Sequence, residues 1–250
     1  MATSGTTAFD LPIDEIVEEA FERTGMRGNR TGYQLKSARR SLNILLTEWN
    51  NRGINLWKVK LATIPLVEGQ AEYTYANDNT NFPQDISDVL EAYVRNNTTA
   101  TAPVDTTLSK IDRSAYAALA NKLAKGTPSQ YYVQKTRYIR NAAGNVTASP
   151  SVFLYQTPSS SFSGTNFQLK FYYVAKVEDA GAYTNEADVI HGFIPCMCSG
   201  LAYYLSLKYS PETAQENKLI YEDELQRALT ADGSRTSTHI TPQTFYGDGV

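Results

Sequence analysis

The sequence predicts an α+β protein in which helices from both ends of the chain form one bundle, with an antiparallel β domain inserted between them. Three observations indicate this. Apolar residues recur every three or four positions in residues 12–52 and 193–232, alternate between residues 57 and 174, and follow neither period after residue 233. We expect N-terminal helices in residues 1–56, a sandwich- or barrel-like β domain in 57–177, C-terminal helices in 178–232 and an extended tail in 233–250.

A first helix is expected over Pro12–Thr24, because Ile13, Ile16, Val17, Ala20 and Phe21 have helical spacing. Asp10 can cap its start and Gly25 can end it. The other side of this helix carries a row of carboxylates: Asp14, Glu15, Glu18, Glu19 and Glu22. Acids near a helix N-terminus are favoured by the helix dipole, and adjacent carboxylates without histidine usually face water, so we interpret the row as surface.

A second helix is expected over Thr31–Arg52, where Thr31 and Gln34 form a capping box and Gly53 provides a stop. Its apolar face is built from Leu35, Ala38, Leu42, Leu45, Leu46 and Trp49. A different face carries Lys36, Arg39 and Arg40. These cations can contact a neighbouring helix or subunit, meet a phosphate backbone, or simply face solvent.

The β domain is predicted from alternation. Residues 57–75 read as a hairpin with its turn at Glu68-Gly69-Gln70. Further strands are expected at Asp88–Arg95, Gln130–Arg140, Ser151–Gln156 and Asn166–Val174, the last with Phe167, Leu169, Phe171 and Tyr173 on one face. A short helix capped by Asp112 interrupts them near residues 112–125.

Helical spacing returns at Phe193, Met197, Leu201, Leu205 and Lys208, with Pro195 placed in the first turn. Ser210-Pro211-Glu212 predicts the start of a last helix that runs through Leu219, Ile220, Leu225 and Leu229 to Asp232. The tail then combines a polar lead with scattered candidate anchors: Arg235, His239, Ile240, Phe245 and Tyr246. Such a segment is either a free terminus or a docking arm for another chain.

Composition excludes several functions. With 23 Lys+Arg against 26 Asp+Glu the net charge is −3, which disfavours a histone-like binder. Two Cys and two His are too few for structural zinc, and we expect Cys196 and Cys198 to be reduced core residues. The nucleotide-binding and hydrolase motifs we sought are absent from the sequence, so neither catalytic residues nor a cofactor are expected. The sequence contains no run of about 18 apolar residues and begins without a signal peptide, which predicts a protein made in a cytoplasm.

Several separated stretches resemble one family. They are PIDEIVEEAFERTG (12–25), TGYQLKSARRSLNILLTEWNNRGINLW (31–57), DRSAYAALANKLAKGTPSQYYV (112–133) and FIPCMCSGLAYYLSLKYSPETAQENKLIYEDELQRALTADGSRTSTHITP (193–242). In this order they look like head-to-tail adaptor (connector) proteins of short-tailed bacteriophages, of the tail tubular protein A type. Pro12 departs from the Ser or Thr expected as the first helix cap.

The resemblance implies a structural virion protein of the neck and tail. It implies a dodecameric ring that binds the portal protein and the tail nozzle protein, and through which double-stranded DNA passes without sequence-specific contacts during ejection. It also implies that a C-terminal segment clasps the portal or a neighbouring subunit. No membrane, metal or cofactor is implied.

A glycan-binding or glycan-degrading tail component is the alternative. The chain has 17 Tyr, which can stack on sugars, and a pair of carboxylates suited to glycoside hydrolysis is a three-dimensional feature that sequence does not exclude. Sugar binding predicts tyrosines clustered on one exposed concave face. The adaptor predicts tyrosines spread through the β core and subunit borders.

Overall fold

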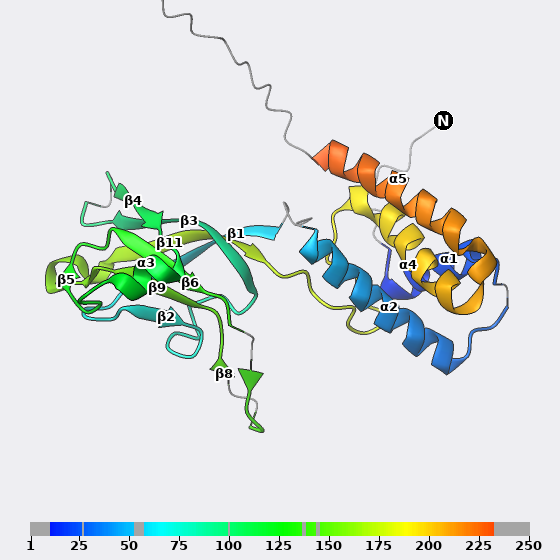
Figure 1. Cartoon of the computed structure of the whole chain (residues 1–250), viewed down its shortest axis with the longest axis horizontal. Helices are drawn as coiled ribbons and strands as arrows, with labels where there is room; N and C mark the ends of the chain where they lie inside the picture. Colours follow the sequence, from blue (N-terminus) through cyan, green and yellow to red (C-terminus); the bar gives the residue numbers. More distant parts are fainter. Residues whose placement is uncertain are drawn as a thin grey trace, which may run out of the picture. The chain divides into compact units, whose positions relative to one another are not determined.

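The computed structural model describes residues 11–26, 28–52, 58–99, 101–136, 139–143 and 146–232 (Figure 1). The longer helices lie toward the two ends of the chain and a curled sheet lies between them, with short helices among its strands, which confirms the α+β class. Contacts divide the chain into two units. The helical unit comes from both ends of the chain, up to Leu45 and from Ala182 onward, and the β unit is Leu46–Gly181.

The helices of the helical unit are α1 (Ile13–Arg23), α2 (Gly32–Asn51), α4 (Ile194–Tyr209) and α5 (Ala214–Asp232), with short 3-10 turns η3 (His191–Phe193) and η4 (Pro211–Thr213) before the last two. The end of α2 after Leu45 is assigned to the β unit. Since α1, α2, α4 and α5 fall in the predicted helical stretches, the helices themselves are confirmed, with ends shifted by a few residues.

Local signals explain where α1 and α2 begin and end. The Thr31 hydroxyl accepts from the Gln34 amide at 3.3 Å and the Gln34 carboxamide accepts from the Thr31 amide at 2.9 Å, which confirms the capping box. Gly25 has φ +78°, a left-handed conformation that suits glycine. Its amide donates to the Glu22 carbonyl at 2.9 Å, which ends α1. Asp10 and Gly53 lie outside the described residues.

Helix α4 is buried almost all round and is packed against both α1 and α5. Its Pro195 lies in the first turn, as expected, because the missing amide hydrogen is not needed there. Phe21 of α1 and Tyr209 of α4 have ring centroids 6.2 Å apart. Cys196 and Cys198 are buried and free, which confirms the prediction for them.

The β unit is built on a sheet that, within the described residues, has seven strands in the order β1-β11-β3-β4-β6-β9-β2. These strands are β1 (Val59–Leu66), β2 (Glu72–Thr74), β3 (Ile86–Asn96), β4 (Val104–Lys110), β6 (Gln130–Gln134), β9 (Ser151–Tyr155) and β11 (Gly164–Ala175). Neighbours are antiparallel except β4 and β6. Two small ribbons pair β5 (Lys125–Gly126) with β10 (Thr157–Pro158), and β7 (Ile139–Arg140) with β8 (Val146–Ala148).

The sheet curls around one apolar core that receives side chains from both of its edge strands (Figure 1). Leu169, Phe171 and Tyr173 of β11 enter this core together, with Phe167 packed against it, as the alternation predicted. The Tyr73 hydroxyl of β2 accepts from the Val67 amide just after β1, at 3.2 Å, so the two edges approach each other. Burial of each of these side chains contributes about 1.5–3 kcal/mol to the stability of the unit.

The short helix α3 (Arg113–Ala118) begins where Asp112 caps it, with the Asp112 carboxylate accepting from the Ala115 amide at 2.6 Å. It ends at Ala118, earlier than predicted. A second short helix in this unit, η2 (Ser160–Phe162), precedes β11. Tyr116 of α3 stacks on Tyr132 at 5.3 Å and contacts Phe153 at 5.4 Å. The helix is therefore held on the sheet by one aromatic side chain.

The predicted hairpin in residues 57–75 is wrong. The turn at Gly69 exists, with φ +73°, but β1 pairs with β11 and β2 pairs with β9. In β1 the inward residues are Ala62, Ile64 and Leu66, whereas Val59 and Leu61 are exposed. Alternation identifies a strand but not its partner, because the partner is chosen by packing across the whole sheet.

Other strand and helix details also differ. The single strand predicted at Gln130–Arg140 is divided into β6 and β7, which pair with different strands. Strand β4 was not predicted, because only Leu108 in it is buried. The Ser210 side chain forms no cap bond, and Leu219 and Ile220 of α5 are 63% and 42% exposed. The buried side of α5 is instead Asn217, Tyr221, Leu225 and Ala228.

Candidate functional site: charged faces of the helical unit

Helix α1 presents an exposed row of carboxylates, here called the acidic face, made of Asp14, Glu15, Glu18 and Glu22. The helix is fixed at its start, since the amides of Ile13 and Asp14 donate to the carbonyls of Asn185 and Tyr183, both at 3.0 Å. Within the described parts of the chain, no cation forms an ion pair with these four carboxylates. The face therefore carries unneutralised negative charge on a rigid support.

The neighbouring carboxylate Glu19 behaves differently. It accepts from Arg23 at 2.8 Å, and Arg23 also lies 3.7 Å from Glu224 of α5. These contacts join α1 to α5. Glu19 thus belongs to the internal structure of the unit, and the acidic face is what remains available to a partner.

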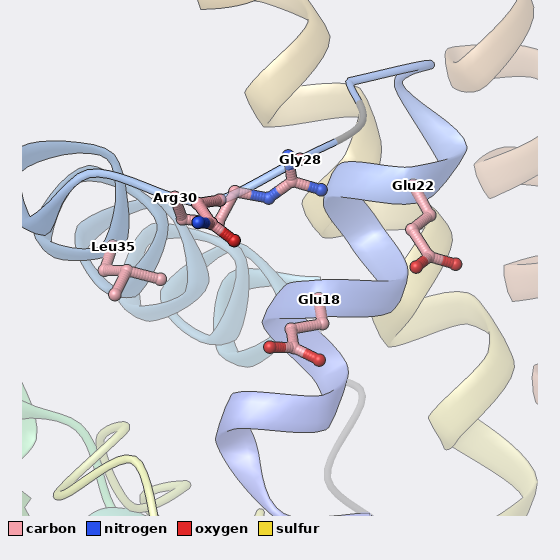
Figure 2. Close-up of a pocket in the computed structure, with 6 residues that line it drawn as sticks. Glu18, Glu22, Gly28, Arg30 and Leu35 are labelled. Atoms are coloured by element: carbon pink, nitrogen blue, oxygen red, sulfur yellow. The ribbon is translucent and has the colours of Figure 1, made fainter.

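A cleft of about 1060 Å³ lies beside the acidic face (Figure 2). It is lined by Glu18 and Glu22 of α1, by Gly28, Asn29 and Arg30 of the connection, and by Leu35 of α2. Arg30 reaches toward α1, where its guanidinium lies 4.7 Å from the Phe21 ring centre and donates to the Met26 carbonyl at 2.7 Å. Arg30 is held at the wall in this way and forms no described ion pair with either carboxylate.

A second hollow, of about 450 Å³, also lies beside α1. Its apolar wall comes from Leu11, Ile194 and Pro195, and its charged rim includes Glu15, Glu18 and Glu22. Glu18 and Glu22 of the acidic face therefore line both hollows. A hollowed surface can receive side chains of a partner, which a flat charged surface does not.

Opposite charge is gathered on the basic face, defined as Lys36 and Arg40 of α2 and Lys208 of α4. Lys36 and Arg40 are exposed and four residues apart, so they share one side of the helix. Arg39, the third predicted cation, is half-buried and already interacts within the chain. Exposed apolar side chains surround the face: Tyr33 at 75%, Ile44 at 47% and Leu207 at 51% exposure.

Lys208 was not singled out from sequence as a site residue. Its ammonium donates to the Ser41 hydroxyl at 2.6 Å and to the Ser37 hydroxyl at 3.1 Å, both on α2 and both buried. Burial lowers the pKa of Lys208 below its ordinary value, and the positive charge of Arg40 lowers it further. Two serines four residues apart, each directly after a cation, were the available signal, but only the fold brings Lys208 to them.

The buried thiols are poor candidates for chemistry. Burial raises the pKa of Cys196 to about 12 and that of Cys198 to about 11, so both are protonated at neutral pH. In the described residues, no group of three or more His, Cys, Asp or Glu side chains is placed to hold a metal ion. None of the described helices is long and apolar enough to cross a membrane.

Tyrosines are distributed over both units. Tyr73, Tyr131 and Tyr173 are in the β core and Tyr221 is buried in the helical unit. Tyr33 and Tyr172 are exposed, one in each unit. Arg235, His239, Ile240, Phe245 and Tyr246, the candidate anchors of the tail, lie outside the described residues. No protein-family model matches the sequence, and no curated protein matches it either.

Proposed function

We propose that this chain is a structural ring subunit, a head-to-tail adaptor of the kind found in short-tailed bacteriophages, that joins a portal to a tail nozzle and lets double-stranded DNA pass. In this proposal the chain is a virion protein and performs no chemistry. The observation that carries the proposal is the separation of unneutralised charge on one rigid unit, negative on α1 and positive on α2 and α4.

A closed ring needs two different surfaces on each subunit, because every subunit contacts one neighbour on each side. Faces of opposite sign meet this need. They attract when two copies associate head to tail, and they repel when like faces meet. A nearly neutral subunit also makes few phosphate contacts, so DNA is not held strongly in a channel.

Within the ring, we assign the Tyr33–Lys36 end of the basic face to the acidic face of the next subunit. Tyr33 and Lys36 are three residues apart at the start of α2, so both point to the same side. Tyrosine is enriched at protein interfaces, and a lysine beside it can attract the carboxylates of a partner. The hollows beside Glu18 and Glu22 can accept both side chains.

The proposal includes a four-helix bundle made by α1, α2, α4 and α5. In its support, a methyl group added at Gly200 of α4 would meet Leu45 of α2 at 3.0 Å and Tyr221 of α5 at 2.8 Å. Arg23 links α1 to α5 and Phe21 links α1 to α4. The bundle gives the two charged faces a fixed separation, which a ring with a defined number of subunits requires.

The glycan-binding alternative has less support. Its discriminating feature is a cluster of exposed tyrosines, whereas the two most exposed described tyrosines, Tyr33 and Tyr172, belong to different units. The aromatic group of Tyr116, Tyr132 and Phe153 is half-buried and attaches α3 to the sheet. The distribution therefore favours the structural function.

The test is the mass of the assembled particle, measured by native mass spectrometry on the chain alone and mixed with the portal protein of the same virus. The wild-type chain should form rings in at least one of these samples. The E18K/E22K variant should not, because it reverses the charge beside both hollows. Adding K36E to that variant should recover part of the assembly by restoring the attraction.

The matched control is E212K/E216K, which makes the same change of charge on exposed residues of η4 and α5. This control should assemble like the wild type. A wild-type chain that remains a single copy with and without portal would remove the proposal, as would equal assembly of E18K/E22K and the control.

A further inference from the structure

The other end of the basic face has a geometry that suits a small oxyanion. We infer that Lys208 and Arg40, with Lys208 positioned by Ser37 and Ser41, form a binding site for a phosphate group, either a phosphodiester of nucleic acid or free phosphate. The choice of nucleic acid as the source rests on the proposed function, whereas the site itself does not.

The first argument is the way Lys208 is held. An ammonium group has three N–H donors. Two of them go to the hydroxyls of Ser41 at 2.6 Å and Ser37 at 3.1 Å, and the third makes a long 3.5 Å contact with the Ser37 carbonyl. The ammonium is therefore fixed in direction, and a phosphate oxygen can replace the weakest of its three contacts.

The second argument is charge. Within the described residues no carboxylate pairs with Lys208 or with Arg40. The oxygens that accept hydrogen bonds from Lys208 in this part of the chain are all neutral. The two cations are close enough for Arg40 to destabilise the ammonium form of Lys208. An anion between them would remove this repulsion, and a guanidinium with an ammonium is a common combination at phosphate oxygens.

The third argument is access and rigidity. Ser37 and Ser41 are 7% and 1% exposed and lie on adjacent turns of α2, so the hydroxyls are fixed by the helix. Lys208 and Arg40 themselves are exposed. A phosphate can therefore approach from solvent, and little side-chain order is lost when it binds. Tyr33 and Lys36, at the start of α2, remain for the neighbouring subunit.

The proposal is tested by binding of a fluorescently labelled mixed-sequence DNA duplex to the full chain over a range of salt concentrations. Each phosphate contact contributes about 0.9 to the slope of log affinity against log salt. We expect K208Q and R40Q each to reduce the slope by about that amount. The S37A/S41A variant keeps both charges, so it should weaken binding several-fold and leave the slope nearly unchanged.

The matched control is K218Q, which removes an exposed lysine of α5 in the same unit and should keep the wild-type slope. Circular dichroism of each variant checks that the helices remain. Inorganic phosphate distinguishes the two sources: if it binds to the wild type and not to K208Q, while DNA binding is the same in both, the ligand is free phosphate.

The inference is overturned if K208Q and R40Q bind both probes as the wild type does, or if the wild type binds neither. The mass of each sample, measured in parallel, separates this inference from the proposed function. A chain that stays a single copy yet binds DNA through Lys208 keeps the phosphate site and loses the ring.

Discussion

Gly200 lies in the middle of α4, at a place where side chains of two other helices are in contact range. A Cβ atom there would come within 2.8 Å of Tyr221 and 3.0 Å of Leu45, both of which are buried. Neither side chain can move outward to solvent. The small size of this residue is therefore a condition for the close packing of α2, α4 and α5.

We predict that Gly200→Ala destabilises the protein. Overpacking of a buried site costs about 1–3 kcal/mol, and the better helix propensity of alanine recovers roughly 1 kcal/mol. The net loss should be up to about 2 kcal/mol, measured as a lower urea midpoint by circular dichroism. Gly32→Ala is the control, because a Cβ at Gly32 meets nothing within 4 Å. A G200A protein as stable as G32A would show that α2, α4 and α5 leave room for a methyl group at residue 200, contrary to the close approach of these helices.

At the residue scale, the sequence was sufficient to predict that Lys36 and Arg40 share one side of a helix, because residues four apart are neighbours on a helix surface. It was not sufficient for Lys208, whose partners Ser37 and Ser41 are 171 and 167 positions away. It was also insufficient for Arg39, which shares the motif but is half-buried. A contact between distant segments depends on the packed fold, which local periodicity does not contain.

At the scale of elements, the start of α2 is specified by its own sequence. The reciprocal bonds between Thr31 and Gln34 satisfy two amides that have no partner in the helix. The turn that follows carries Tyr33 and Lys36, the residues assigned to the neighbouring subunit. The capping box thus stabilises the end of the helix and keeps these side chains in position.

We predict that Thr31→Ala lowers the free energy of unfolding by about 1 kcal/mol, because the amide of Gln34 loses its acceptor. Hydrogen exchange of the first-turn amides of α2 should become faster, and ring assembly weaker. Thr31→Ser keeps the hydroxyl and should behave like the wild type in both measurements. Unchanged exchange in T31A would mean that tertiary packing alone holds the first turn.

Strand pairing is the opposite case, because the local sequence does not determine which strands are neighbours in the sheet. Strand β11 was predicted well, because its inward residues are large and alternate strictly. Strand β4 was missed, since Leu108 is its one buried residue. The 57–75 segment was correctly read as two extended stretches around a turn, yet each stretch pairs with a strand about 80 or more residues further along.

At the scale of the whole molecule, the last described helix, α5, ends at Asp232, and the segment that follows it lies outside the described residues. This segment contains the candidate anchors Arg235, His239, Ile240, Phe245 and Tyr246. A truncation after Asp232 tests whether they act in assembly or belong to a free terminus.

We predict that the chain ending at Asp232 keeps the circular dichroism spectrum and the urea midpoint of the full chain, because all the described helices and strands and both described cores are retained. Its binding to the portal protein should be at least tenfold weaker, since the apolar anchors Ile240, Phe245 and Tyr246 are lost. Replacing these three residues by serine in the full chain is the control for tail length and should have the same effect. Equal portal binding by the truncated and full chains would exclude the tail from assembly and leave the charged faces as the surfaces that hold the ring together.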